Sequence, residues 1–289
     1  MTQRVTGVTK HNLFYFLLIS GTLLSTPTLS ADIDFTALPA VSEFNGKVEF
    51  GGGTAGSTIL GNSGEFYGAA SLSIPLGERF GLQADFANVN AFGQNSTGAA
   101  AHLFTRDPKS YLIGGLAGYA NFDAATGAWV GPEAELYLDN ISIEATAGYM
   151  SLTPNGAASQ DKFFALGDIG LYATDNLRLT VGASSIADFK SAHAGMEWLL
   201  SDTGMPVSFK ADGRIGDDNF YSLTAGISFY FGGPEKSLIR RHREDDPRNR
   251  VFDIFSAGGV HLGHSATVPL PDCIYVEGNP INRPCIPSA

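Results

Sequence analysis

The sequence of 289 residues has few basic residues, with 18 Lys and Arg against 29 Asp and Glu and a formal net charge of −11. A protein that binds nucleic acid needs a basic face to neutralise phosphates, so this shortage excludes that class of partner. Long apolar runs are also missing after the N-terminal region, where no stretch approaches the roughly 18 residues of a transmembrane helix. We therefore expect neither a nucleic-acid partner nor a helical membrane span.

Cysteine is scarce as well, because the chain contains only Cys273 and Cys285. In an oxidising compartment the usual fate of such a pair is a disulfide that closes a small loop, and we predict that bond here. The spacing of the two cysteines does not reproduce a zinc-binding pattern, and neither does that of His261 and His264 in HLGH. We predict no metal site and no cofactor.

The N-terminal region has the features of a secretory signal peptide. Arg4 and Lys10 precede the apolar run LFYFLLISGTLL, which leads into the small residues of TLSA. We predict a signal peptide over residues 1–31 and an N-terminal segment over residues 32–43. The mature protein is then exported, into a compartment where a disulfide can form.

From about Phe44 to Phe231 the sequence repeats one unit, a run of alternating apolar and small polar residues followed by a turn. Successive side chains of a strand point to opposite faces, so YSLTAGISFYF places its apolar residues on one face and its small polar residues on the other. NISIEATAGYM and LRLTVGAS alternate in the same way. The pattern predicts an antiparallel sheet with one apolar face. In YLIGGLAGYANF the facing stays open, because Tyr111 and Ile113 compete with Leu112 for the apolar side.

The connections between these runs predict a membrane barrel. We expect tight turns at PLGER, TRDPKS, LDN, TDN and SDTGMP, and longer Gly-, Asn- and Ser-rich connections between them, such as NVNAFGQNSTG. Short turns that alternate with longer external loops are typical of bacterial outer-membrane barrels. Five turns and six loops join twelve strands. The short turns and both chain termini are expected on the periplasmic side, and the longer loops on the external side.

The region 44–232 resembles a bacterial outer-membrane β-barrel of the porin-like kind, and GISFYF resembles the aromatic last strand that the barrel-assembly machinery recognises. The segments GLQADF, ATDNLRLTVG, EWLL, GRIGDD and FYFGGPEKSLIRRHREDDP are similar to those of uncharacterised exported barrels of proteobacteria. The resemblance implies an all-β fold, a single antiparallel up-and-down transmembrane barrel of about twelve strands. It also implies the outer membrane of a Gram-negative bacterium, with outer-membrane lipid and the barrel-assembly machinery as partners. It implies no substrate and no site.

If the apolar face contacts lipid, the opposite face lines the interior of the barrel. The alternation then predicts these lumen-lining residues: Lys47, Glu49, Asp85, His102, Arg106, Glu133, Glu135, Glu144, Asp168, Arg178, His193, Glu197, Lys210, Asp212 and Arg214. Two interpretations remain open, an aqueous passage that selects solutes by charge and a ladder of salt bridges that fills a narrow barrel. Twelve strands lie between the filled barrels of eight and the open barrels of sixteen or more. Residues 32–232 contain 9 basic and 22 acidic residues, so an open passage would favour cations.

Catalysis is not expected. Only His102 and His193 lie in the predicted strands, and neither accompanies a nucleophile motif such as G-x-S-x-G. Glu133 and Glu135 lie two residues apart on one face, and we interpret them as lumen charges rather than an acid–base pair. We predict no catalytic residues and no enzyme activity.

Residues 233–289 lack the barrel pattern and are predicted to form a periplasmic C-terminal tail. The run KSLIRRHREDDPRNR is expected to be a solvated linker or short helix that leaves the barrel, or a contact with cell-wall material or a periplasmic partner. The expected function is a porin-like channel for passive diffusion of small hydrophilic solutes or ions, with a weak preference for cations. The alternative is a structural or surface-interaction barrel with a plugged lumen, which acts through its external loops or its tail.

Overall fold

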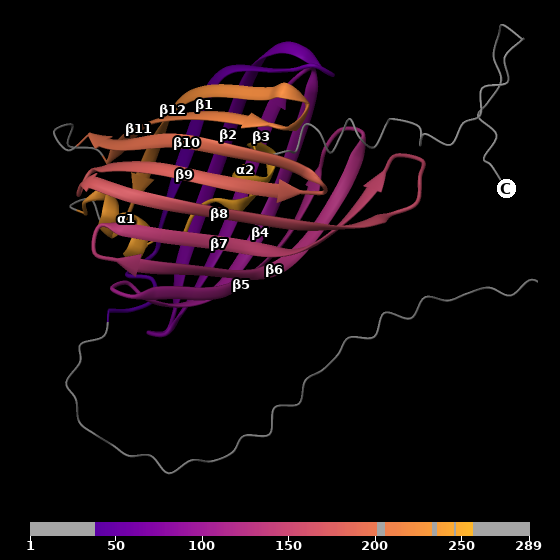
Figure 1. Ribbon diagram of the computed structural model, residues 1–289. Helices are drawn as coiled ribbons and strands as arrows, with labels where there is room; N and C mark the ends of the chain where they lie inside the picture. Colours follow the sequence, from indigo (N-terminus) through magenta and orange to yellow (C-terminus); the bar gives the residue numbers. More distant parts are fainter. Residues whose placement is uncertain (1–37, 201–205, 233–235, 246, 257–289) are drawn as a thin grey trace, which may run out of the picture. The chain divides into compact units, whose positions relative to one another are not determined.

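The computed structural model describes residues 38–200, 206–232, 236–245 and 247–256. The expected signal peptide and the two cysteines lie outside these residues. Within them, twelve antiparallel strands form a closed barrel in which each strand pairs with its neighbours in sequence and β1 pairs with β12 (Figure 1). The prediction of a twelve-stranded up-and-down barrel is confirmed.

The strands are 10 to 16 residues long. They are β1 (Asn45–Ser57), β2 (Gly61–Leu76), β3 (Phe80–Ala91), β4 (Gln94–Asp107), β5 (Tyr111–Asn121), β6 (Ala125–Leu138), β7 (Ile141–Pro154), β8 (Gln160–Thr174), β9 (Leu177–Ile186), β10 (Phe189–Leu200), β11 (Val207–Gly216) and β12 (Phe220–Phe231), with a 3-10 turn, η2 (Asp217–Asn219), before β12. No helix in the described part of the chain has the length and apolar composition needed to cross a membrane.

The connections differ from the expected rhythm of short turns and long loops. Apart from the connection after Leu200, which is only partly described, each contains two to five residues at either end of the barrel. The stretch NVNAFGQNSTG, predicted as a loop, instead extends β3 and β4 and turns at Phe92 and Gly93, whose φ angles are 54° and 73°. Two positive φ angles in a two-residue turn match the twist of a hairpin. The prediction of long external loops is therefore wrong.

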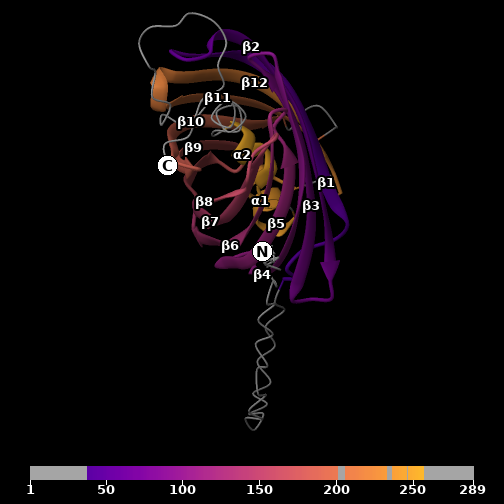
Figure 2. The same ribbon diagram turned by 90° about the vertical axis from the view of Figure 1, so that its right-hand side faces the viewer.

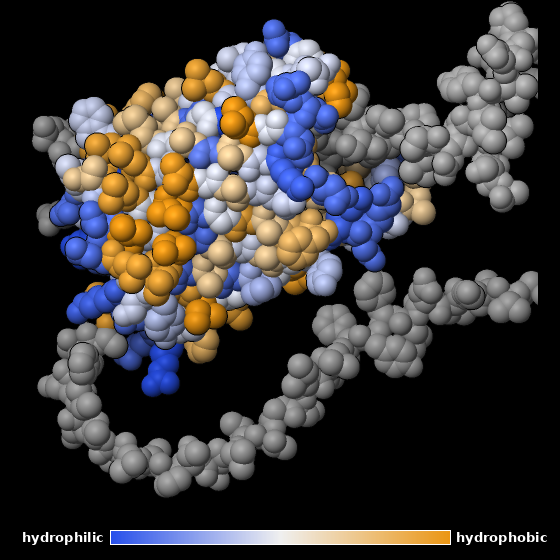
Figure 3. Space-filling view, viewed as in Figure 1, coloured by the Kyte–Doolittle hydropathy of each residue, from blue (hydrophilic) through white to orange (hydrophobic). Residues whose placement is uncertain are grey.

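The outward face of the barrel is apolar. Phe66, Val130, Tyr149 and Leu223 are each at least 60% exposed, although they come from different strands. Figure 3 shows such apolar surface over the middle of the barrel wall, with hydrophilic residues nearer the ends of the strands. In YLIGGLAGYANF, Ile113 faces outward with 57% exposure, whereas Leu112 is buried inside. An apolar outward face of this kind is the surface that hydrocarbon covers in membrane barrels.

After β12 the chain turns back into the barrel. Two short helices, α1 (Leu238–Glu244) and α2 (Arg250–Ile254), lie inside the ring of strands (Figure 2). We call residues 236–245 and 247–256 the lumen segment. The prediction that the chain leaves the barrel after β12 is wrong for these residues; the rest of the expected tail lies outside the described residues.

The inward face of the barrel is polar in one part and apolar in another, which explains why the lumen segment folds there. Leu116, Trp129 and Phe164 belong to an inward apolar cluster, and Val251 and Ile254 of the lumen segment complete it. Burial of these apolar groups away from water stabilises the docked segment. The prediction of a polar and charged inward face did not include this apolar patch.

Residues before β1 pack inside the barrel at the end where β1 begins. Val41 is fully buried against Phe104, Leu112 and Tyr137, and the Arg106 guanidinium donates a hydrogen bond of 2.7 Å to the Ala40 carbonyl. The described part of the predicted N-terminal segment is thus packed onto the barrel.

Candidate functional site: the charged lumen

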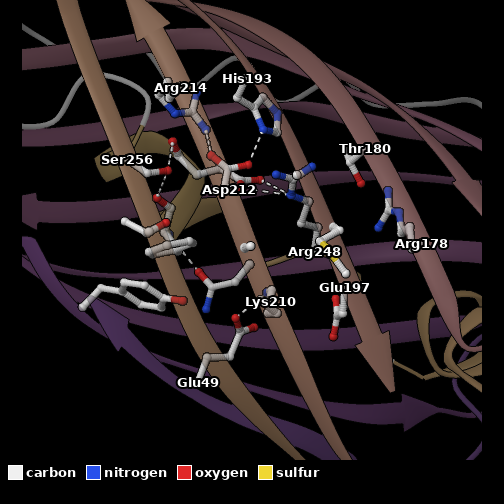
Figure 4. A pocket seen from close by; sticks show the side chains of 18 of the residues that line it. Glu49, Arg178, Thr180, His193, Glu197, Lys210, Asp212, Arg214, Arg248 and Ser256 are labelled. Atoms are coloured by element: carbon white, nitrogen blue, oxygen red, sulfur yellow. Dashed lines mark hydrogen bonds and ion pairs between the residues drawn. The ribbon is translucent and has the colours of Figure 1, made fainter. Parts of the chain in front are cut away.

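The residues predicted to line the lumen lie on the inward face of the barrel, where hydrogen bonds and ion pairs link them to one another, to neighbouring polar groups or to the lumen segment. Most are buried, and only His193, Lys210 and Asp212 keep partial exposure. Figure 4 shows several of them around one cavity. Whether they line a conducting passage stays a prediction.

Each of the two barrel histidines bridges two carboxylates. His102 Nε2 lies 3.1 Å from Asp85, and its Nδ1 lies 2.9 Å from Glu133. These three residues come from β3, β4 and β6, so the bridge connects three strands across the inside of the wall. Such a link fixes the wall from within and leaves the histidine without a free ring nitrogen.

The second bridge has the same form on the other side of the barrel. His193 Nε2 and Nδ1 each lie 2.7 Å from a carboxylate oxygen, those of Asp168 and Asp212. The Arg248 guanidinium of the lumen segment lies 2.8 Å from the same Asp168 side chain. This bridge therefore connects β8, β10 and β11 to the segment in the lumen.

The lumen segment is anchored by backbone groups of the wall as well as by charges. The Asn249 amide donates to the carbonyls of Ala70 and Phe86 at 3.0 and 3.1 Å, while its oxygen accepts from the Phe252 N–H at 2.9 Å. The Arg250 N–H donates to the Asp85 carboxylate at 2.9 Å. The cap of α2 is thereby also its attachment to β2 and β3.

The charges of wall and segment are complementary. The predicted lumen residues together with Glu65 comprise nine acidic and five basic side chains, a net charge of −4 with neutral histidines. The lumen segment carries six basic and three acidic residues, a net charge of +3. Charges buried without partners cost several kcal/mol each, so this near-balance allows both sets to be buried together.

A cavity of about 100 Å³ remains between the wall and the lumen segment. Glu49, Glu197, Lys210, Asp212 and Arg248 line it (Figure 4), and the Lys210 ammonium donates to Glu49 at 2.5 Å. Such a volume holds several water molecules.

His242 of α1 is a titratable group of the lumen segment that is buried against the wall. Its Nδ1 lies 2.9 Å from the Tyr172 hydroxyl, and its Nε2 lies 3.5 Å from the Glu197 carboxylate. Burial lowers the pKa of His242 below its ordinary value because the charged ring loses hydration, although the Glu197 carboxylate opposes this shift. The buried ring is therefore neutral near pH 7.

Sequence reasoning missed Glu65 and the polar residues of the lumen segment. Glu65 shares the inward side of β2 with Tyr67, but it directly follows GTAGSTILGNSG, whose Gly and Ser content predicts a loop. In RNRVFDIF, Asn249 precedes apolar Val251, Ile254 and Phe255 at helical spacing, which is a helix start with a buried face. The sequence therefore predicts a short helix with an apolar face, but it does not show that this face packs against the inner wall of the barrel.

A closed antiparallel barrel with an apolar exterior and ionisable side chains inside is the architecture of transmembrane β-barrel proteins. The sequence matches no protein-family model and no curated protein. Among solved structures, the chain is similar to the KdgM porin in complex with disordered oligogalacturonate, with 8% identity, a TM-score of 0.49 and coverage of 64% of this chain and 99% of that one. The NanC porin gives 9% identity, a TM-score of 0.49 and coverage of 64% and 98%. An active-site mutant of outer membrane phospholipase A from Escherichia coli has 13% sequence identity and a TM-score of 0.45, and the match covers 70% of this chain and 94% of that one. At these values the likenesses carry no argument about what this chain binds or does.

Proposed function

We propose that this protein is an outer-membrane channel for small hydrophilic solutes and ions, with a weak preference for cations, and that the lumen segment closes it. The observation that carries the proposal is the acidic inward wall beneath an apolar exterior. An aqueous lumen with excess carboxylates concentrates cations and repels anions over about 8 Å at physiological salt. With the segment docked inside the ring of strands the lumen is occupied, so conduction requires the segment to move.

The wall does not depend on the lumen segment for its strand pairing. All twelve strands pair with each other, and neither helix contributes a strand to the ring. The bridges at His102 and His193 also join wall residues directly. The barrel can therefore stay closed around a lumen from which the segment has been displaced. Outer-membrane lipid and the barrel-assembly machinery are the partners that this location requires.

The occupied lumen favours a second function, a structural barrel that is permanently plugged. In that case the protein works through the surfaces at its two ends or through a partner of its C-terminal residues, in the periplasm or the cell wall. The external connections are too short to form a large binding surface by themselves. The two functions differ in one measurable property, the ion current.

Planar-bilayer recordings in a salt gradient test the channel. Three proteins are compared: the full chain, a chain that ends after Gly232, and the full-length variant Arg248→Glu, which places a carboxylate beside Asp168 and Asp253 and repels the segment. We expect little current from the full chain, and steady current with a preference for potassium over chloride from the other two.

The preference for potassium over chloride is tested with two matched variants of the chain that ends after Gly232. Glu135→Gln removes a cavity-lining charge with little change in volume and is expected to weaken the potassium preference. Glu78→Gln, at an exposed turn outside the lumen, is expected to leave it nearly unchanged. If none of the folded proteins carries current, the channel is rejected and the plugged barrel stands.

A further inference from the structure

The path of the lumen segment has a direction along the barrel. The barrel has two ends, which we name by their connections. The near mouth is formed by residues 77–79, 108–110, 139–140 and 175–176, together with the start of β1 and the end of β12. The far mouth is formed by residues 58–60, 92–93, 122–124, 155–159, 187–188 and 217–219.

The segment begins at the near mouth. The Leu238 N–H donates to the Asn176 side chain at 3.1 Å, and the Ile239 N–H donates to the Asp175 carbonyl at the same distance. The Arg243 guanidinium donates to the Asp139 carbonyl at 2.7 Å. Helix α1 is thus bound to two near-mouth turns.

From there the chain advances toward the far mouth. Asn249 binds the carbonyl of Ala70, which lies in the middle of β2. The Phe255 ring lies 5.5 Å from the ring of Phe122, a residue of the far-mouth connection 122–124, in an edge-on contact. Figures 1 and 2 show both helices inside the ring of strands along this path. Between Leu238 and Phe255 the chain has crossed most of the barrel.

A return of the chain to the near mouth would have to pass beside the docked segment, along a wall that the segment already contacts through Arg248 and Asn249. The cavity between the lumen segment and the wall measures about 100 Å³. Apolar packing of Val251, Ile254 and Phe255 against the wall closes the other side of the segment. The way forward from Ser256 leads to the far mouth.

We propose that the protein threads its own C-terminal end through its barrel, so that the chain after Ser256 leaves by the far mouth. The end of β12 and the C-terminus of the protein then lie on opposite sides of the membrane. With the near mouth in the periplasm, the barrel is an anchor that presents its last residues at the cell surface, in place of the periplasmic tail that the sequence suggested. This inference rests on the proposed membrane location and is independent of conduction.

Cysteine labelling on intact cells tests the path in the full-length protein. In a background of Cys273→Ser and Cys285→Ser, a reporter thiol is placed at the C-terminus with Ala289→Cys. Two reference thiols mark the mouths at exposed positions, Ala158→Cys at the far mouth and Glu78→Cys at the near mouth. We expect Ala289→Cys to react with an impermeant maleimide as Ala158→Cys does, whichever mouth faces outward. If labelling of Ala289→Cys instead matches that of Glu78→Cys, the proposal is overturned.

Cross-linking of the purified protein tests which mouth the chain after Ser256 leaves by, and it does not require knowing which mouth faces the cell exterior. Position 258 is two residues beyond the described segment, so its reach is only about 7 Å from Ser256. With a short bismaleimide, Gly258→Cys is expected to link to Asp123→Cys of the far mouth and not to Glu78→Cys of the near mouth. The reverse pattern, or equal yields with both partners, rejects threading. Absence of ion current leaves this result unchanged, so the two proposals fail separately.

Discussion

Among single residues, Asn249 joins the middle of the lumen segment to the wall through an uncharged amide. One amide satisfies two wall carbonyls that belong to Ala70 and Phe86, and it caps α2 through the Phe252 N–H. These are backbone groups, which no change of wall side chains removes. Loss of the amide removes these wall contacts and the cap of the Phe252 N–H at the same time.

The first prediction is that Asn249→Ala loosens α2. Loss of an N-cap costs about 1 kcal/mol, and 1.4 kcal/mol corresponds to a factor of ten in an equilibrium. With Val251→Cys as a buried reporter, in a background that lacks the native cysteines, alkylation of the purified protein should become roughly fivefold faster. Arg240→Ala is the control, because the Arg240 side chain is 56% exposed and bonds only within α1. Equal rates in Asn249→Ala and the parent would refute the role of the amide.

Among the elements, helix α1 depends on its contacts with the barrel for its stability. It has seven residues, fewer than an isolated helix needs for stability in water. Its Ser237 cap makes no side-chain hydrogen bond, and the segment is held by the near-mouth turns and by burial of Leu238 and Arg241. Docking and helix formation are therefore one event, and a change in docking energy should appear as exposure of the whole helix.

The second prediction is that acid releases α1. The pKa of His242 is lowered in the docked state, so the undocked segment binds more protons; docking is strongest above about pH 6.5 and weakens as the pH falls below that value. The charged groups that face the ring are Glu197, which favours its protonation, and Arg178 and Lys47, which oppose it. A Leu238→Cys reporter should therefore become more reactive between pH 7 and pH 5.5, relative to an exposed Glu78→Cys thiol.

His242→Asn provides the matched control for the acid effect. Asparagine retains hydrogen-bonding groups but does not titrate, so its reporter should show a flatter pH profile. Parallel profiles in the two proteins would assign the acid effect to another group.

In the whole molecule, two sets of contacts stabilise the barrel. The ring of twelve paired strands forms one, and the lumen segment with its apolar and ionic contacts forms the other. Without the segment, apolar side chains such as Leu116 and Phe164 face water inside the barrel, at a cost of about 25 cal/mol for each Å² exposed.

The third prediction is that a chain ending after Gly232 assembles but loses heat resistance. A loss of about 3 kcal/mol lowers the unfolding midpoint of a domain of this size by roughly 6–12 °C. The measurement is the temperature at which the folded form disappears from an unboiled SDS gel. A chain ending after Ser256 keeps the segment and should behave like the full protein. The same midpoint for both shortened chains would show that the segment adds no stability.

The wall of the barrel follows from sequence patterns alone. Strand periodicity fixes the facing of each side chain, so alternation predicts that Glu49, Asp168 and Arg214 point inward. It also gave twelve strands, because each change of direction leaves a turn signal. The lengths of the connections were not encoded so clearly, since Asn, Gly and Ser suit strand ends as well as loops. For that reason β3 and β4 ran further than expected, to a turn at Phe92 and Gly93.

Only the tertiary structure decided what occupies the lumen. The carbonyl bound by Asn249 is 179 residues away in the chain, and the carboxylate bound by Arg248 belongs to a strand in the middle of the sequence. A run of mixed charges such as KSLIRRHREDDPRNR is equally compatible with solvent and with a complementary wall, because its own pattern does not contain its partners. The acidic face that pairs with it exists only when twelve strands have closed into a ring, and the apolar patch that buries Phe255 is assembled from several of them.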